Sequence, residues 1–207
     1  MKKFFLLALF LFSVPVFSQI TGLSGWNIVV DPGHSQQENM GINNYPEAMK
    51  VLYVARHLQS FLMDSTDIDT VYLTRTDSLQ IVGLSQRSDY ANSIGAAWFH
   101  SIHSDAGGAS SNSTLLLWGQ YSNGLEKVPN GGKAMSDIIV GNLTKGYRIP
   151  TRGSVGDCTF YGGCTGTGPY LSVNRLTNMP SELSEAGFHT NPMQNSLNMN
   201  YEWKRLE

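Results

Sequence analysis

Short apolar runs alternate along this chain with longer segments of helical periodicity, and this alternation limits the possible folds more than any other feature. Residues 27–31 (NIVVD) form an apolar run typical of a buried strand. Residues 46–63 follow it with apolar side chains at helical spacing. Repeated alternation of strand and helix predicts an α/β layered fold with a mostly parallel sheet.

The same hydrophobic periodicity predicts bounds for five strands and four helices. The predicted strands are residues 27–31, 70–75, 97–103, 115–118 and 181–185. The predicted helices are residues 46–63, 85–94, 132–145 and 193 to the chain end. We expect Pro46 to start the first helix, Ser85 to cap the second and Gly95 to lie just past its end.

The N-terminus has the pattern of a secretory signal peptide. Two lysines precede an apolar run over residues 4–14, and small residues lead to a cleavage point between Ser18 and Gln19. About eleven apolar residues fall short of the ~20 that span a bilayer, so stable membrane insertion is not expected. The sequence therefore predicts removal of residues 1–18 and export to the periplasm or the medium.

Residues 19–207 are expected to form one domain, because the chain has the length that a single core serves. The last residues, 201–207, stop inside a helical pattern without a C-cap, so we expect the domain to be truncated at its C-terminal helix. An alternative left open is a longer exported protein with wall-targeting or anchoring domains after residue 207.

Composition excludes two classes of protein. Hydrophobic residues make up 41% of the chain, which is too apolar for intrinsic disorder. The 14 basic and 16 acidic residues leave no positive footprint for a phosphate backbone, so nucleic acid is not an expected partner.

Cys158 and Cys164 lie in a glycine-rich run over residues 153–168. In an oxidising compartment they can close a short disulfide that stiffens this loop. A zinc site on this pair is the weaker interpretation, because structural zinc sites normally have closer ligands and a second pair.

Four polar residues are placed where chemistry is expected in such a sheet, beyond the carboxyl ends of the strands. His34 follows the first strand, Glu47 opens the next helix, His103 closes the third strand and Glu185 closes the last. Two imidazoles and a carboxylate are natural Zn²⁺ ligands, and a second carboxylate can accept the proton of a zinc-activated water. From spacing alone, structural roles for the two histidines are an equal alternative.

Six segments together resemble one enzyme family. They are VVDPGH (29–34), Glu47 at a helix start, VYLTR (71–75), LSQRSDYAN (84–92), FHSIHSDA (99–106) and SEAGFHTN (184–191). Their order and content resemble the zinc-dependent N-acetylmuramoyl-L-alanine amidases of the third family type, which are bacterial cell-wall enzymes.

The resemblance implies that His34, Glu47 and His103 bind Zn²⁺ and that Glu185 is the catalytic acid and base. It implies cleavage of the amide between N-acetylmuramic acid and L-alanine, with peptidoglycan or muropeptides as substrates. The implied fold is a twisted, mostly parallel sheet of about six strands with helices on both faces. Alternatives left open are a zinc peptidase or carboxypeptidase acting on stem peptides, and a catalytically silent wall-binding module.

Three other histidines are predicted to lie outside the metal site. His57 is expected at the surface, and His100 is expected in the core, bonded to a neighbour. His189 follows Glu185 by four residues, and contact with a ligand is the minor alternative for it.

Among the charged residues, Arg75 and Arg87 are interpreted as structural ion-pair formers. Asp105 either orients a substrate or is simply solvated. Glu182 is excluded as a base, because strand alternation points it away from Glu185. Residues 109–180 resemble the family least, and we expect them to shape substrate choice.

Overall fold

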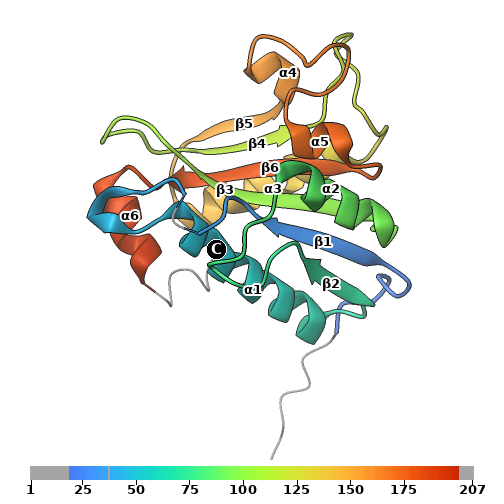
Figure 1. The fold of residues 1–207 in the computed structure, drawn as a ribbon, viewed down its shortest axis with the longest axis horizontal. Helices are drawn as coiled ribbons and strands as arrows, with labels where there is room; N and C mark the ends of the chain where they lie inside the picture. Colours follow the sequence, from blue (N-terminus) through green and yellow to red (C-terminus); the bar gives the residue numbers. More distant parts are fainter. Residues whose placement is uncertain (1–18, 37, 201–207) are drawn as a thin grey trace, which may run out of the picture.

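The structure is a computed structural model that describes residues 19–36 and 38–200. The predicted signal peptide lies outside the described residues. Six strands form one sheet in the order β2-β1-β3-β6-β4-β5 (Figure 1). Their bounds are β1 Asn27–Pro32, β2 Thr70–Leu73, β3 Trp98–Asp105, β4 Thr114–Trp118, β5 Thr151–Gly156 and β6 Ser181–Phe188. The helices are η1 Ile42–Asn44, α1 Glu47–Ser65, α2 Leu84–Ser93, α3 Gly132–Tyr147, α4 Asp157–Phe160, α5 Ser172–Leu176 and α6 Pro192–Met199.

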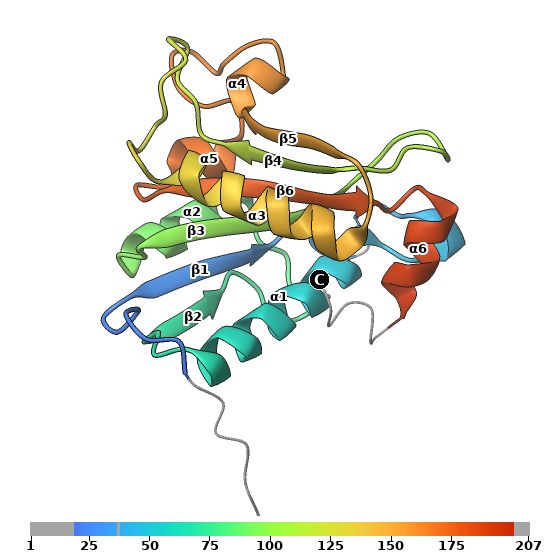
Figure 2. The same cartoon turned by 180° about the vertical axis from the view of Figure 1, so that it is seen from behind.

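Neighbouring strands run parallel except β4 and β6, which pair antiparallel. Helices α1 and α3 cover one face of the sheet (Figure 2), and α2 and α5 cover the other (Figure 1). The predicted α/β class, the mostly parallel sheet and the helices on both faces are confirmed.

The two faces of the sheet bury separate apolar clusters, as strand alternation requires. Ile28 and Ile102 pack with Val51 on the α1 side. Val29 and Phe99, their neighbours in the chain, pack on the opposite side, toward α2 and α5. Continuous apolar strands such as NIVVD are therefore needed because the sheet is covered on both faces.

Several predicted element bounds are wrong. β6 continues to Phe188, so Glu185 lies inside the strand and does not close it. β3 likewise continues to Asp105, two residues beyond His103. β2 ends at Leu73, and the hydroxyl of the next residue, Thr74, donates to the buried carboxylate of Asp31.

Helix α2 begins one residue earlier than predicted, and its N-cap is Gly83. The side chain of Gln86 accepts a hydrogen bond from the Gly83 backbone N–H at 2.7 Å. Ser85 therefore lies within the first turn and is not the cap. Gly95 does follow the helix end, with φ +60°.

β5, α4 and α5 were not predicted from the sequence. β5 is one of the two edge strands of the sheet, and most of its residues are exposed or half-buried. An edge strand needs no apolar run, so the hydrophobic pattern gave no signal there. α4 and α5 are single turns, too short for helical periodicity to be recognised.

The last helix, α6, begins one residue before its predicted start. The Asn191 side chain accepts hydrogen bonds from the backbone N–H groups of Met193 and Gln194, which caps the helix. Its predicted continuation over residues 201–207 lies outside the described part of the chain. Within residues 19–36 and 38–200, none of the helices is long and apolar enough to cross a bilayer.

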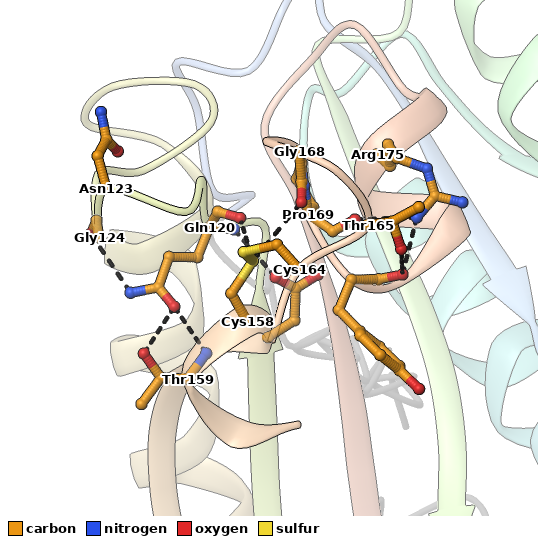
Figure 3. The surroundings of a disulfide bond; sticks show 12 residues. Gln120, Asn123, Gly124, Cys158, Thr159, Cys164, Thr165, Gly168, Pro169 and Arg175 are labelled. Atoms are coloured by element: carbon orange, nitrogen blue, oxygen red, sulfur yellow. Dashed lines mark hydrogen bonds between the residues drawn. A yellow bond between two sulfur atoms is a disulfide. The ribbon is translucent and has the colours of Figure 1, made fainter. Parts of the chain in front are cut away.

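Cys158 and Cys164 form a disulfide, as the sequence analysis favoured (Figure 3). Their Cα atoms lie 4.7 Å apart. The Gln120 side chain holds the neighbouring turn, since its Oε1 accepts hydrogen bonds from the backbone N–H and the hydroxyl of Thr159. The segment after β5 is thus held in place, and we call residues 157–170 the clamped loop.

Candidate metal centre

His34 stands directly after β1, where Pro32 and Gly33 end the strand. Its backbone has φ 57°, the left-handed conformation that a side chain rarely adopts outside turns. The turn aims the half-buried imidazole at helix α1, with Nε2 3.2 Å from Glu47 Oε2. A side chain held in this rare backbone conformation is typical of a functional site.

Glu47 is the first residue of α1, and its side chain is 1% exposed. The extended Pro46 that precedes it starts the helix, as predicted. Oε1 accepts a hydrogen bond from the Ser104 backbone N–H at 2.7 Å, and Oε2 accepts one from Asn39 Nδ2 at 2.9 Å. The carboxylate is thereby fixed between β3 and the loop that follows β1.

His103 completes the group from β3. Its Nδ1 lies 3.2 Å from Glu47 Oε1 and 3.1 Å from His34 Nε2. One donor atom from each of these three residues lies within 4.8 Å of the others. The structure therefore brings together the three predicted ligands in a group that could hold one metal ion.

The charge state of Glu47 suits such a group. Burial raises its pKa, but hydrogen bonds from His103 and His34 and their charges outweigh burial and hold the pKa well below its usual range. The carboxylate is thus ionised, which is the form that binds a metal.

Glu185 lies beside His103, because the two residues are register partners in the parallel pair of β3 and β6. Its Oε2 atom is buried, and no described residue gives that oxygen a hydrogen bond. Burial raises the pKa of Glu185 well above its usual range, and the charges of Glu47 and Asp105 raise it further. A buried, unpartnered carboxyl oxygen next to a possible metal site is a candidate for proton transfer.

A bulge in β6 follows directly after Glu185. His103 pairs with Glu185, whereas Asp105 pairs with Phe188, so β6 has one residue more than β3 at this point. Gly187 provides the irregular conformation, with φ +72°. Bulges next to sites re-aim side chains, which is consistent with its place here.

Beneath the site, Arg87 forms a buried ion pair with Asp31 at 2.6 Å, as predicted. Arg75 is also buried but donates to backbone oxygens, namely those of Pro32, Gly33 and Ala48. The two guanidinium groups thus hold the loop that carries His34.

Two residues near the group were not given this place by the sequence analysis. Asn39 Nδ2 lies 2.9 Å from His34 Nε2 and also donates to Glu47. His189 is buried, donates from Nδ1 to the Ser104 carbonyl at 2.6 Å and lies 3.5 Å from Glu47 Oε2. The prediction that His189 lies outside the site was therefore wrong. Only its place in SEAGFHTN, four residues after Glu185, pointed toward the site.

The other candidate residues lie elsewhere. His100 is buried on the opposite face of the sheet, with Nδ1 2.6 Å from Glu182 Oε1, so both expectations for this pair agree with the structure. His57 is half-buried and lines an apolar cavity of about 870 Å³ between α1 and α3. Asp105 forms an ion pair with Arg152 of β5.

Known proteins resemble this chain in sequence and in fold. A family model described as N-acetylmuramoyl-L-alanine amidase matches residues 28–206. N-acetylmuramoyl-L-alanine amidase CwlM of Bacillus licheniformis is 39% identical over 82 residues. That match takes in 39% of this chain and 32% of the relative, so the chain spans about a third of the length of that relative.

Solved structures share the fold. An N-acetylmuramoyl-L-alanine amidase from Clostridium difficile 630 superposes with a TM-score of 0.73 at 24% identity, covering 89% of this chain and 91% of that one. The catalytic domain of CwlV from Bacillus (Paenibacillus) polymyxa var. colistinus gives 0.68 at 24% identity, covering 87% and 90%. The family match spans all six strands and the residues around the candidate metal centre, so the chain belongs to the N-acetylmuramoyl-L-alanine amidase family.

Proposed function

We propose that this chain hydrolyses peptidoglycan at the amide between N-acetylmuramic acid and the L-alanine of the stem peptide, with Zn²⁺ as its cofactor. The observation that carries the proposal is the meeting of His34, Glu47 and His103 beside the buried carboxyl of Glu185, in a chain of this family.

The donor set fits zinc. Two imidazole nitrogens and one ionised carboxylate are a typical protein contribution to a catalytic zinc site, which leaves a position for water. When bound, Zn²⁺ lowers the pKa of a water to roughly 7 and polarises a carbonyl oxygen. Asn39 and Ser104 hold the Glu47 carboxylate in place, and such supporting contacts strengthen a metal site.

Glu185 performs the proton transfers in this proposal. Its free, buried Oε2 accepts the proton of the attacking water and later delivers it to the departing alanine nitrogen. Delivery of the proton matters, because an amine leaves poorly without it. Glu182 takes no part, since it is bonded to His100 and to Trp98 Nε1 on the other face.

The proposal includes export. Residues 1–18 act as the signal peptide and residues 19–207 form the catalytic domain. The disulfide is consistent with an oxidising compartment. Mass measurement of the processed protein should give Gln19 as its first residue, and a chain that retains residue 1 would contradict this part.

The test of the activity is digestion of purified peptidoglycan, with products identified by mass. The amidase releases intact stem peptides and leaves unsubstituted glycan, and a chelator abolishes both products until Zn²⁺ is restored. Shortened stem peptides would indicate the peptidase alternative. Binding to the wall without any soluble product would indicate a wall-binding module.

A further inference from the structure

Two aromatic contacts join three rings on the disulfide-clamped loop. The rings of Tyr161 and Tyr170 stack with centroids 4.1 Å apart and an interplanar angle of 16°. The Phe160 ring meets Tyr161 edge to face at 5.0 Å. We call Phe160, Tyr161 and Tyr170 the aromatic platform.

The platform is open to solvent although its rings are large and apolar. Phe160 is 38% exposed, and each of the two tyrosines is 43% exposed. Tyr161 is in contact with both other rings, so the outer face of Tyr170 is the part of the stack that neither of them covers. An aromatic surface held open in this way is typical of a binding site.

Arg152 connects the platform to the end of β3 that carries His103. The Arg152 guanidinium packs over the Phe160 ring at 5.6 Å and over the Phe188 ring at 5.3 Å. The same guanidinium pairs with Asp105, which follows His103 by two residues. Burial raises the pKa of Tyr161 to about 12, and the charge of Glu185 contributes to this increase. Tyr161 therefore keeps its hydroxyl proton and can donate it.

The loop holds the platform rigid before any ligand binds. The disulfide joins Cys158 to Cys164 and so closes the turn that contains Phe160 and Tyr161 (Figure 3). Arg175 Nη1 donates to the carbonyl oxygens of Pro169 at 2.9 Å and Tyr170 at 2.8 Å. Preorganisation of this kind lowers the entropy cost of binding.

We propose that the aromatic platform is a sugar-binding subsite, which stacks on one N-acetylhexosamine ring of the glycan strand next to the scissile amide. A pyranose ring has a flat face of C–H groups and a rim of hydroxyls, which matches an aromatic face with phenol groups at its edge. A stem peptide with free carboxylates matches the platform less well, because the platform offers aromatic faces and the Arg152 guanidinium beside it is already paired with Asp105. The inference rests on the proposed function, which supplies the glycan substrate.

The test measures binding without cleavage. Full-length mature Glu185→Gln protein, loaded with Zn²⁺, is titrated calorimetrically with chitotetraose, a peptide-free N-acetylglucosamine oligomer. We expect Tyr170→Ala to weaken this binding about tenfold and Tyr170→Phe to retain it. Tyr121→Ala is the matched control, because Tyr121 is 38% exposed and lies outside the stack. Unchanged binding of chitotetraose by the Tyr170→Ala variant would overturn the proposal. The proposal would also fail if Tyr170→Ala weakened the binding of a free stem peptide and left the binding of the sugar unchanged.

A second measurement does not depend on the folding of an alanine variant. Chitotetraose should protect Tyr170 from nitration in the Glu185→Gln protein while Tyr121 reacts at its usual rate, as located by peptide mass. Equal nitration of Tyr170 with and without chitotetraose would overturn the proposal that the aromatic platform binds sugar. If the sugar protects Tyr170 but the wild-type chain releases no stem peptide, the proposed function fails and the subsite stands.

Discussion

The distance between the two candidate histidine ligands depends on a residue that has no side chain. Gly33 separates Pro32 from His34, and its backbone N–H donates to the Ile102 carbonyl at 3.0 Å. A Cβ at position 33 would collide with the His103 ring. The φ of Gly33 is not in the left-handed region, so its conformation does not require glycine. Glycine is needed here because the backbone approaches the His103 imidazole closely.

Gly33→Ala is therefore expected to displace His103 and to weaken zinc binding by about 10–100-fold, as loss of ligand support typically does. Competition with a chromogenic chelator measures the affinity. Gly141→Ala is the control, since a Cβ there meets nothing within 4 Å on helix α3. Equal zinc affinity in both variants would disprove the role given to Gly33.

Variants of two glutamates of β6 can distinguish a loss of catalysis from a loss of packing. Glu185→Gln should lower kcat by about 10²–10⁴-fold, because the amide cannot carry a proton, while zinc content stays unchanged. Glu182→Gln, three residues earlier on the other face, should fold and retain its rate. The measurement is stem-peptide release together with elemental analysis. A similar loss in both variants would indicate a structural cause.

At the scale of elements, β6 is the strand on which the site depends. It pairs parallel with β3 and antiparallel with β4, so it joins the two parts of the sheet. The first pairing places Glu185 beside His103. The antiparallel pairing brings β4, and through it the edge strand β5, against the side of Glu185 away from His103. Arg152 lies on β5 and the clamped loop follows β5, so the pairing of β4 with β6 brings both to this side of the sheet.

Removing the disulfide should loosen the clamped loop and leave the metal centre intact. The double variant Cys158→Ser, Cys164→Ser is expected to lose about 2 kcal/mol of unfolding free energy, since the crosslink closes a short loop. Urea unfolding measures the loss, and wild-type protein under reducing conditions should match the variant. Unchanged stability, or loss of zinc affinity, would contradict this prediction.

On the scale of the whole molecule, one buried ion pair ties several elements together below the site. Asp31 of β1 accepts hydrogen bonds from Arg87 of α2, from Ser101 of β3 at 2.6 Å and from Thr74, which follows β2. Burial raises the pKa of Asp31, but the charge of Arg87 and these hydrogen bonds outweigh it and lower the pKa below its ordinary value. The network therefore stabilises the fold through an ionised carboxylate.

The sign of the pH dependence follows from the lowered pKa. The stabilisation is fully present above the pKa of an unfolded aspartate, about 4, and is lost as pH falls through the lower folded value. At pH 7, Asp31→Asn should lose about 3–5 kcal/mol, because it leaves Arg87 buried without its partner. The difference from wild type should shrink at pH 3.

Urea unfolding at the two pH values measures this difference. Asp89→Asn is the control, because Asp89 is exposed on the same helix as Arg87 and its loss should change stability by less than about 0.5 kcal/mol. A constant difference between Asp31→Asn and wild type at both pH values would refute the assignment.

The hydrophobic pattern of the sequence predicted those strands and helices whose own residues form a clear apolar run or a long helical repeat. The strand at Asn27–Pro32 and the helix at Glu47–Ser65 are both long or apolar enough to be recognised from their own residues. β5 gave no such signal, because most of its residues are exposed or half-buried and it has no apolar run. The place of His189 beside Glu47 was also missed, because it depends on how the end of β6 packs against β3 and α1.

The sequence by itself determined the α/β class and supplied each chemically capable residue, since periodicity and residue type are local properties. Only the tertiary structure decided that His34, Glu47 and His103 converge, because long stretches of chain separate them and the sheet register and the docking of α1 set their distances. It also decided that the rings of Tyr161 and Tyr170, which are separate in the sequence, stack on each other. Contacts between distant segments arise from packing, and no local pattern in the chain encodes them.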